Sequence, residues 1–243
     1  MCTVSWLHHE TGFELLCNRD EKLTRKPAAA PCVQRRGGMR FLTPVDGDHG
    51  GSWITANEHG VALCLLNGAN LGGASTPASK AAGPSRGLIL LQLAAAPSAM
   101  AACEQLARMD LLQTPPFTLV ALEPGLPASV AEWNGTELAI LPNADPFMPL
   151  ISSSFDTHAV QRQRRTEFAL RTRARLDAPS LYRFHESHGS GASAYTPCMH
   201  RPGAQTVSFS WVKVDDRSIE FFYSPAAPCQ WQPGQTLRLE RRA

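Results

Sequence analysis

A short run of apolar residues, Val61 to Leu66, is the part of the sequence that most restricts the possible folds. It follows the turn-forming residues 57–60, Asn-Glu-His-Gly, and contains no polar side chain, which predicts a strand. Side chains along a strand point alternately to the two faces of the sheet, so a strand with no polar residue needs cover on both faces. The run therefore predicts a sheet that is buried on both sides.

Further strands are expected on both sides of this run, in groups that are separated by pairs of helices. Residues 2–18 predict a hairpin, and residues 24–40 and 68–84 predict loops because they are rich in Pro, Ala and Gly. The later elements are expected as helices over 85–93 and 98–109, short strands over 117–141, helices over 157–176 and 179–186, and a hairpin over 206–223. This order indicates a layered α+β fold with two sheets between helix layers.

Composition places the chain among soluble globular proteins, with 43% hydrophobic and 18% charged residues. Its 243 residues are expected to form one domain, 1–243. A net charge of +2 is too small to indicate nucleic acid as a partner. We expect no membrane span, because no apolar stretch is long enough, and no signal peptide, because no Lys or Arg precedes the first apolar residues.

The seven cysteines predict neither a disulfide framework nor a zinc knuckle, because their number is odd and no pair has C-x-x-C spacing. A reducing cytoplasm fits this pattern, and most of the thiols are expected to be buried. Cys198 and His200 are close in sequence, but no second pair of ligands accompanies them, so we interpret them as packing residues. No metal and no cofactor is expected.

Cys2 is the first residue that suggests chemistry. A small side chain in second place favours removal of Met1, and the released α-amine then belongs to the same residue as the thiol. The ordinary pKa of an α-amine is about 8, so a large neutral fraction is available near neutral pH to accept the thiol proton. Base and nucleophile then share one residue, as in N-terminal nucleophile enzymes. The alternative is that a cysteine occupies this position by chance.

Polar side chains near Cys2 come from the ends of two other strands. Asn18, Arg19 and Asp20 end the second strand of the first hairpin, and hairpin partners lie about 5 Å apart. Asp20 is thus placed to hold a protonated amine, although a charged turn that closes a strand would look the same. Asn67 ends the run of apolar residues and is able to donate a hydrogen bond to an oxyanion, but Asn67-Gly68 is also an ordinary turn dipeptide.

These pieces together resemble a known family. Met1-Cys2, the residues 18–21 (Asn-Arg-Asp-Glu) and 51–54 (Gly-Ser-Trp-Ile), and the stretch 57–67 resemble the NRDE family, also called the transport-and-Golgi-organisation type. The stretch 57–67 is also similar to choloylglycine hydrolases and penicillin V acylases, which are Ntn hydrolases with an N-terminal cysteine. The resemblance implies a four-layer αββα sandwich of two antiparallel sheets between helix layers.

The resemblance also implies roles for single residues. Cys2 matches the nucleophile, Asp20 matches the carboxylate that contacts its amine, and Asn67 matches an oxyanion donor. The acylases carry an Arg immediately before the N-x-D sequence, where this chain has Cys17. They also carry a second functional Asn near mid-chain, and Ser153 stands at that place here. Their bile-salt or penicillin specificity is therefore not expected.

Four further positions are candidates for contact with a substrate. Asn18 and Arg19 flank the predicted active-site carboxylate, and Trp53 is expected either on a pocket floor or in the core. Arg201 is a candidate for binding a substrate carboxylate. The arginines that crowd residues 157–176 are interpreted as a solvated helix face, with contact to an anionic ligand as the alternative.

The expected function is acyl transfer: an N-terminal cysteine hydrolase that cleaves a small or non-peptide amide C–N bond. A small-molecule substrate is the expected partner, and a homo-oligomer is possible. The alternative is a non-enzymatic binding or trafficking protein for a lipid, haem or acyl-type ligand, because one scaffold supports several functions.

Overall fold

The computed structural model describes residues 2–68, 85–230 and 232–242. The expected removal of Met1 and, apart from Gly68, the predicted loop over 68–84 lie outside these described residues. Within them the chain builds two antiparallel sheets of seven strands each.

The first sheet contains both ends of the described chain. Its strand order is β10-β1-β2-β12-β13-β14, and β11 pairs with β12 outside this path. The strands are β1 (Cys2–His8), β2 (Phe13–Lys22), β10 (Leu150–Ser152), β11 (His200–Arg201), β12 (Ala204–Val214), β13 (Ser218–Ser224) and β14 (Gln235–Glu240). The chain therefore returns to the N-terminal hairpin after about 130 residues to complete the sheet around it.

The second sheet follows the sequence, with neighbouring strands in the order β3-β4-β5-β6-β7-β8-β9. The strands are β3 (Ala29–Arg36), β4 (Met39–Val45), β5 (Ile54–Asn57), β6 (Ala62–Asn67), β7 (Phe117–Leu122), β8 (Ser129–Trp133) and β9 (Leu138–Leu141). Two helices lie between β6 and β7 in the sequence. The two strands are nevertheless direct neighbours in the sheet and pair antiparallel.

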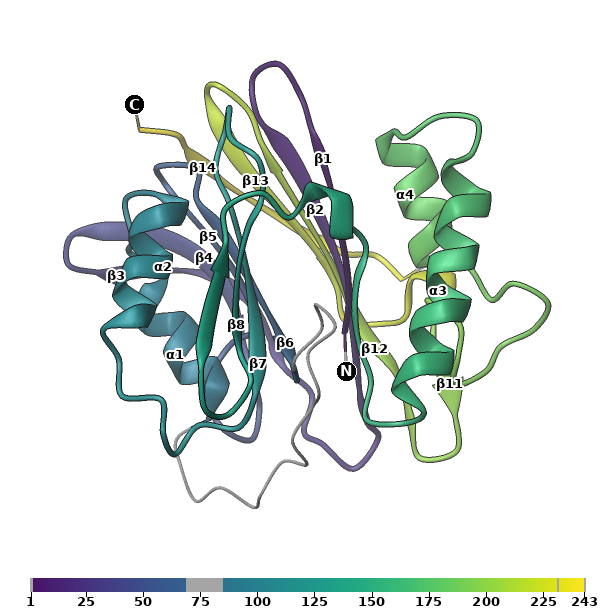
Figure 1. Cartoon of the computed structure of the whole chain (residues 1–243). Helices are drawn as coiled ribbons and strands as arrows, with labels where there is room; N and C mark the ends of the chain where they lie inside the picture. Colours follow the sequence, from purple (N-terminus) through teal and green to yellow (C-terminus); the bar gives the residue numbers. More distant parts are fainter. Residues whose placement is uncertain (1, 69–84, 231, 243) are drawn as a thin grey trace.

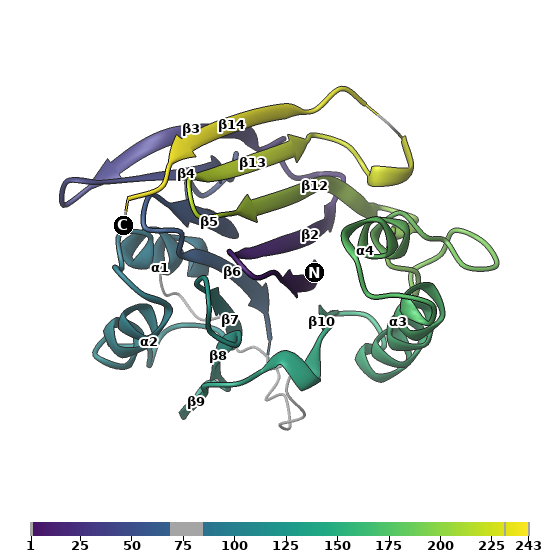
Figure 2. The ribbon, with the colours of Figure 1, turned by 90° about the horizontal axis from the view of Figure 1, so that it is seen from above.

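Helices cover the outer faces of both sheets (Figure 1). The helices α1 (Arg86–Leu93) and α2 (Ala99–Ala107) lie on the second sheet, and α3 (Thr157–Thr172) and α4 (Ala178–His185) lie on the first. Seen from above, the order is helices, sheet, sheet, helices (Figure 2). Two short 3-10 helices, η1 (Asp145–Phe147) and η2 (Pro228–Gln230), complete the elements of the described chain. The predicted αββα sandwich is confirmed.

The apolar run in β6 shows why the sheet needs cover on both faces. Ala62, Cys64 and Leu66 belong to the core between the two sheets. Leu63 and Leu65 point the other way, into the core beneath α1 and α2. A third, smaller core joins the first sheet to α4. The expectation that this strand is buried on both sides is confirmed.

Two local predictions differ from the structure. Residues 24–40, predicted as a loop, contain β3 and the start of β4. β3 is an edge strand whose side chains are mostly exposed, so it lacks the alternating apolar pattern by which strands are recognised, and its pairing is shifted between Ala29 and Cys32. The second strand of the first hairpin also continues to Lys22, so residues 18–21 lie within a strand and not in a turn.

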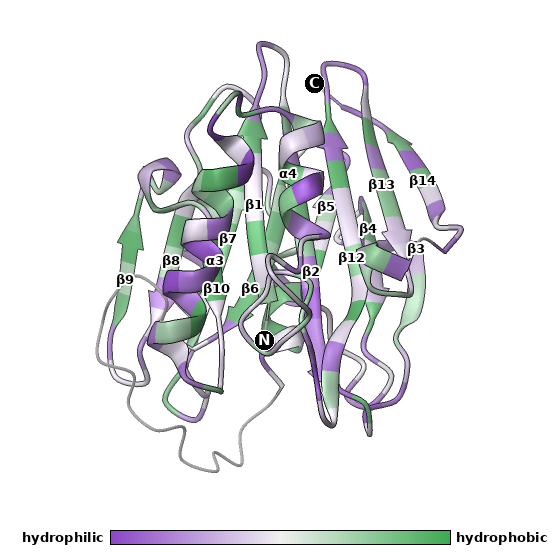
Figure 3. Ribbon diagram, turned by 90° about the vertical axis from the view of Figure 1, so that its right-hand side faces the viewer, coloured by the Kyte–Doolittle hydropathy of each residue, from purple (hydrophilic) through white to green (hydrophobic). Residues whose placement is uncertain are grey.

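Helix α3 carries its arginines on more than one face. Its surface is mostly hydrophilic (Figure 3), and Arg162 is exposed, as expected for a solvated face. Arg164, by contrast, is fully buried. It is four residues from Val160, and i, i+4 neighbours share a helix face, so it lies on the side that packs against the first sheet. The interpretation of a wholly solvated arginine face is wrong at this position.

The helices also bear on the expectation about membranes. No helix in the described part of the chain is both long enough and apolar enough to cross a bilayer.

A buried histidine joins α4 to the first sheet. The Nε2 atom of His185 lies 2.8 Å from the hydroxyl of Ser5 in β1, and the carbonyl of His185 accepts a hydrogen bond of 2.8 Å from Asn18. Burial, together with the nearby Arg164 guanidinium, lowers the pKa of His185 from 6.5 to about 3. The imidazole is therefore neutral in the folded protein across the ordinary pH range.

We expect His185 to make stability depend on pH. The unfolded chain binds a proton near pH 6.5, whereas the folded chain stays neutral at this side chain until about pH 3. The contribution is therefore complete above pH 6.5 and is lost as the pH falls, by about 1.4 kcal/mol per pH unit. Urea unfolding of the wild type and of His185→Gln at several pH values measures it, because the variant does not titrate. The two stability curves should converge on acidification, and parallel curves would contradict the assignment.

Candidate active site

Cys2 begins the strand that lies between β10 and β2. It is opposite Ser152 of β10 on one side and opposite Arg19 of β2 on the other. Its backbone N–H donates a hydrogen bond of 2.9 Å to the hydroxyl of Ser152. The residue is 6% exposed. The two neighbouring strands and this hydrogen bond therefore fix the position of the Cys2 nitrogen.

Cys2, at the beginning of β1, and Asn67, at the end of β6, line one cavity. The beginning of β1 and the end of β6 lie at the same end of the sandwich (Figure 1). The cavity has a volume of about 320 Å³. Cys2, Asp20 and Asn67, which come from β1, β2 and β6, all line it. Of the further residues predicted to contact a substrate, Arg19 and Trp53 also line the cavity. The site is thus built from both sheets.

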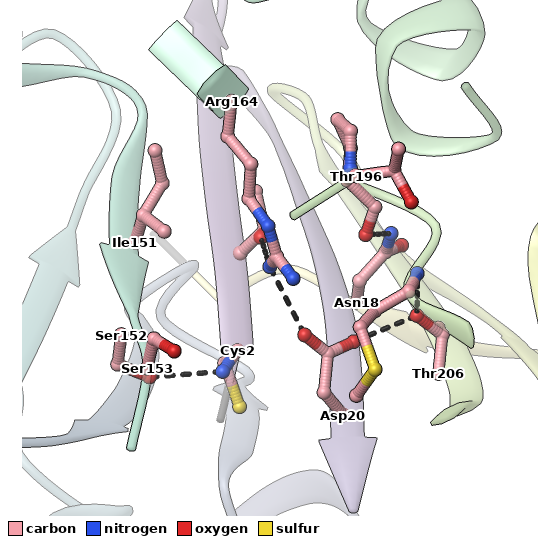
Figure 4. A network of polar contacts seen from close by, with 12 residues as sticks. Cys2, Asn18, Asp20, Ile151, Ser152, Ser153, Arg164, Thr196 and Thr206 are labelled. Carbon is pink, nitrogen blue, oxygen red and sulfur yellow. Dashed lines mark hydrogen bonds and ion pairs between the residues drawn. The ribbon is translucent and has the colours of Figure 1, made fainter. Parts of the chain in front are cut away.

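Asp20 is held rigidly beneath the start of β1 (Figure 4). Its Oδ1 accepts a hydrogen bond of 2.7 Å from the hydroxyl of Thr206, and its Oδ2 lies 3.0 Å from the guanidinium of Arg164. The side chains of Asp20 and Arg164 are both fully buried. Arg164 also donates to the hydroxyl of Thr3, the neighbour of Cys2. A charged pair thus stands beside the first residues of β1.

Three thiols, those of Cys2, Cys17 and Cys64, lie close together in the core between the sheets. Cys17 of β2 is close to Cys2, and its sulfur lies 3.8 Å from that of Cys64 in β6. The hydrogen bond with Cys17 and burial raise the pKa of the Cys2 thiol well above its usual value. The Cys2 thiol is therefore neutral near neutral pH, and any reaction through its thiolate requires a base to remove the proton.

The cavity wall contains three arginines in different electrostatic settings. Arg19 and Arg25 both contact the carboxylate of Asp46, at 2.5 and 2.6 Å, and the Arg19 guanidinium lies 4.4 Å from the centre of the Trp53 ring. Arg86, at the start of α1, donates a hydrogen bond to the carbonyl of Pro116 at 2.9 Å. Within the described residues it has no carboxylate partner. Among the described residues Arg86 therefore forms no ion pair, although the Glu21 carboxylate, which also lines the cavity, attracts its charge.

Three of the predicted residues lie elsewhere. Asn18 is fully buried on the helix side of the first sheet, where its amide donates to the carbonyls of His185 and Pro197. It supports the fold and does not line the cavity. Asn18 shares a face of β2 with Asp20, but it lies nearer the middle of the strand, where the end of α4 and the segment that contains Pro197 cover it.

Ser153 and Arg201 are also outside the cavity wall in the described part of the chain. The Ser153 hydroxyl donates to the carbonyl of Phe155 in an exposed turn, and Arg201 stacks over the Phe155 ring at 5.2 Å. The hydroxyl that contacts Cys2 is that of Ser152, one residue earlier. Successive residues of a strand point to opposite faces, so a shift of one position changes the side from which a side chain acts.

Arg86, Ser152 and Arg164 are missing from the sequence-based prediction. Arg164 had a detectable signal, because it repeats the helical spacing of buried Val160. Arg86 and Ser152 gave no such local signal, since long-range strand pairing and the docking of α1 bring them to Cys2.

Comparison with known proteins places this geometry in context. The model of the family described as Transport and Golgi organisation 2 matches residues 1–170. No curated protein gives a significant match in sequence.

Three similar solved structures are Ntn hydrolases. An N-acylethanolamine-hydrolyzing acid amidase orthologue from Caenorhabditis elegans has a TM-score of 0.57 at 12% identity, over 87% of this chain and 92% of that one. Penicillin V acylase from Agrobacterium tumefaciens has a TM-score of 0.55 at 10% identity, over 99% and 86%. The C2A mutant of the conjugated bile acid hydrolase from Clostridium perfringens has a TM-score of 0.54 at 11% identity, over 99% and 92%. At these identities the likeness shows a shared fold.

We expect Arg164→Met to destabilise the protein by about 3–5 kcal/mol, because it leaves the Asp20 carboxylate buried without its charged partner. Adding Asp20→Asn should restore part of this loss, because the isolated charge is then removed. Urea unfolding measures both. Arg162→Met is the control on the exposed face of α3 and should change stability by less than about 0.5 kcal/mol. Equal effects of the substitutions at 162 and 164 would contradict the role of the buried pair.

We expect Cys17→Ala to lower the pKa of the Cys2 thiol, because the hydrogen bond with Cys17 is the largest cause of its elevation. The rate of Cys2 alkylation as a function of pH, followed by peptide mass spectrometry, measures this pKa. The midpoint should move to lower pH while burial keeps it above the usual value of a cysteine. Cys103→Ala, in α2 on the far side of the second sheet, is the control and should leave the midpoint unchanged. An unmoved midpoint in Cys17→Ala would show that burial alone sets the pKa.

Proposed function

The chain belongs to the Transport and Golgi organisation 2 family, and from this premise we propose that it is an Ntn-type cysteine amidohydrolase. Cys2 is the nucleophile after removal of Met1, and the substrate is a small amide. One observation carries the proposal: Cys2, Asp20 and Asn67, from three strands of two sheets, line a single cavity of about 320 Å³. The Ntn-hydrolase fold of the chain supports it.

The proposed reaction begins with proton transfer within Cys2. Because the thiol is neutral at rest, its proton passes to the free α-amine as the sulfur attacks the amide carbonyl carbon. The buried carboxylate of Asp20, which lines the same cavity, favours the ammonium that forms, since opposite charges stabilise each other. The Ser152 hydroxyl, which accepts from the Cys2 nitrogen, keeps that nitrogen in place.

Breakdown of the intermediate returns the proton. The carbonyl oxygen becomes negative in the tetrahedral intermediate, and the side-chain amide of Asn67 supplies a hydrogen-bond donor for it. The C–N bond then breaks, and the ammonium of Cys2 gives its proton to the departing amine. Water attacks the resulting thioester with the α-amine as the base, which releases the acid and restores the thiol.

One arginine of the cavity wall is a candidate to bind an anionic group of the substrate. Arg19 and Arg25 share the carboxylate of Asp46, whereas Arg86 has no carboxylate partner among the described residues. Arg86 is the residue we assign to a carboxylate or similar group of the substrate, in the role predicted for Arg201. The volume is at the small end of the range of about 300–1,000 Å³ for ligand pockets. N-acyl amino acids satisfy both constraints.

We expect the purified protein to start at Cys2 by intact mass and to hydrolyse members of a panel of N-acyl amino acids. Cys2→Ala should lose activity by a factor on the order of 10⁴–10⁶, the effect of removing a nucleophile. Arg86→Met should raise KM for anionic substrates and spare neutral amides. Cys103→Ala is the matched cysteine control and should retain full activity.

Three results would contradict the proposal. Retained turnover in Cys2→Ala would exclude the nucleophile, and retention of Met1 in fully active protein would exclude the α-amine as base. Binding of an acyl ligand in the cavity, without turnover or a thioester adduct on Cys2, would instead support the non-enzymatic binding function.

A further inference from the structure

Four side chains able to bind a metal meet at the edge of the first sheet, away from the cavity. They come from three separate segments: His188 follows α4, Cys198 precedes β11 and His200 begins it, and Cys229 lies in η2. Their ligand atoms all lie within 4.8 Å of one another. The segment after β13, drawn in yellow, turns toward α4 to reach them (Figure 2).

The distances in this cluster match a tetrahedral metal site. The Nε2 atom of His200 is 3.5 Å from the sulfur of Cys198 and 3.3 Å from the sulfur of Cys229. Zinc bonds of about 2.3 Å to sulfur and about 2.0 Å to nitrogen, at the tetrahedral angle, place the two atoms about 3.5 Å apart. A single imidazole nitrogen has one lone pair or one proton, so it cannot satisfy two thiols by hydrogen bonding alone.

His188 provides an independent observation. Its Nε2 atom is buried and has no hydrogen-bond partner among the described residues. Its ring packs edge-on against His200, with 5.0 Å between the ring centres. Buried polar atoms are nearly always partnered, so an unpartnered nitrogen that closes a cluster of three other ligands indicates a missing partner. A cation at the centre of the cluster is such a partner.

We propose that His188, Cys198, His200 and Cys229 bind Zn²⁺ in a site of two cysteines and two histidines. Two thiolates and two imidazoles are the donors that zinc prefers, whereas Mg²⁺ and Ca²⁺ require oxygen ligands. Binding releases the two thiol protons to solvent, and the two thiolates balance the charge of the ion. Four protein ligands leave no open position, so the site is structural and does not activate water.

Hydrogen bonds connect the proposed zinc site to Asp20 in the candidate active site. Met199, between two of the ligands, donates its N–H to the Thr206 hydroxyl at 2.8 Å. That hydroxyl in turn donates to Asp20 at 2.7 Å (Figure 4). The carbonyl of Cys198 also accepts a hydrogen bond from Thr196. Zinc thus fixes the segment that orients one oxygen of Asp20.

Metal analysis of the purified full chain tests the proposal without reference to activity. We expect inductively coupled plasma mass spectrometry to find about one zinc ion per chain. After chelation, titration with Co²⁺ should give the visible bands of a tetrahedral site and the ultraviolet thiolate-to-cobalt band. Cys229→Ser and His188→Asn should lose most of the zinc and weaken these bands. Cys32→Ser, at the other exposed cysteine, is the matched control and should keep both.

Circular dichroism checks that each variant is folded, and His188→Asn serves if a cysteine variant fails to fold. Absence of zinc together with absence of tetrahedral Co²⁺ bands in the folded wild type would overturn the proposal. A disulfide between Cys198 and Cys229 in protein purified under reducing conditions, found by non-reducing peptide mapping, would also overturn it. Equal metal content in Cys229→Ser and Cys32→Ser would show that the metal binds elsewhere.

Discussion

The buried ion pair between Asp20 and Arg164 is the contact on which the arrangement of helices, strands and cavity depends. Both side chains are fully buried, and Arg164 reaches the hydroxyl of Thr3 as well. Such a pair adds little net stability, but either charge alone in the interior is very unfavourable. Helix α3 therefore has to dock with this one arginine inward, and the same contact holds the carboxylate beneath the first residue of β1. A single ion pair therefore ties the position of a helix on the outside of the sandwich to the position of an acidic group in the cavity wall.

The fold was predictable from the sequence where buried strands produce a recognisable run or alternation of apolar residues. The apolar run in β6 had to be covered on both faces, and the two cores that receive its alternate side chains are those the strand requires. Edge strands leave no such pattern. β3 has charged and proline residues, exposes most of its side chains, and was therefore predicted as a loop. Its pairing with β4 is recognisable only once the rest of the sheet exists, because tertiary context overrides weak local preference.

The same distinction applies to the site. The first hairpin alone brings the end of β2 beside Cys2, so the placement of Asp20 and Arg19 followed from short-range pairing. Residues delivered by long-range pairing were not predictable in this way. The hydroxyl beside Cys2 comes from β10, about 150 positions away, and the one-residue difference between Ser152 and Ser153 reverses the face to which the side chain points. The register of β10 on β1 fixes that choice, and a single sequence contains no independent signal for it.

The end of the family match falls between two groups of residues that hold the site together. The match ends at residue 170, and it includes Cys2, Asp20, Asn67 and Arg164. Thr206 and the four residues of the Cys/His cluster all lie beyond it. One oxygen of Asp20 is therefore held from inside the matched region, by Arg164, and the other from the remaining part of the chain. Because the two oxygens are restrained independently, loss of the contact to Thr206 leaves the charge pair intact but frees the carboxylate to rotate. Cys17 adds to this, because its hydrogen bond, together with burial, raises the pKa of the Cys2 thiol. In the mechanism that we propose, deprotonation of Cys2 therefore depends on the α-amine, and the orientation of Asp20 matters for the ammonium that forms.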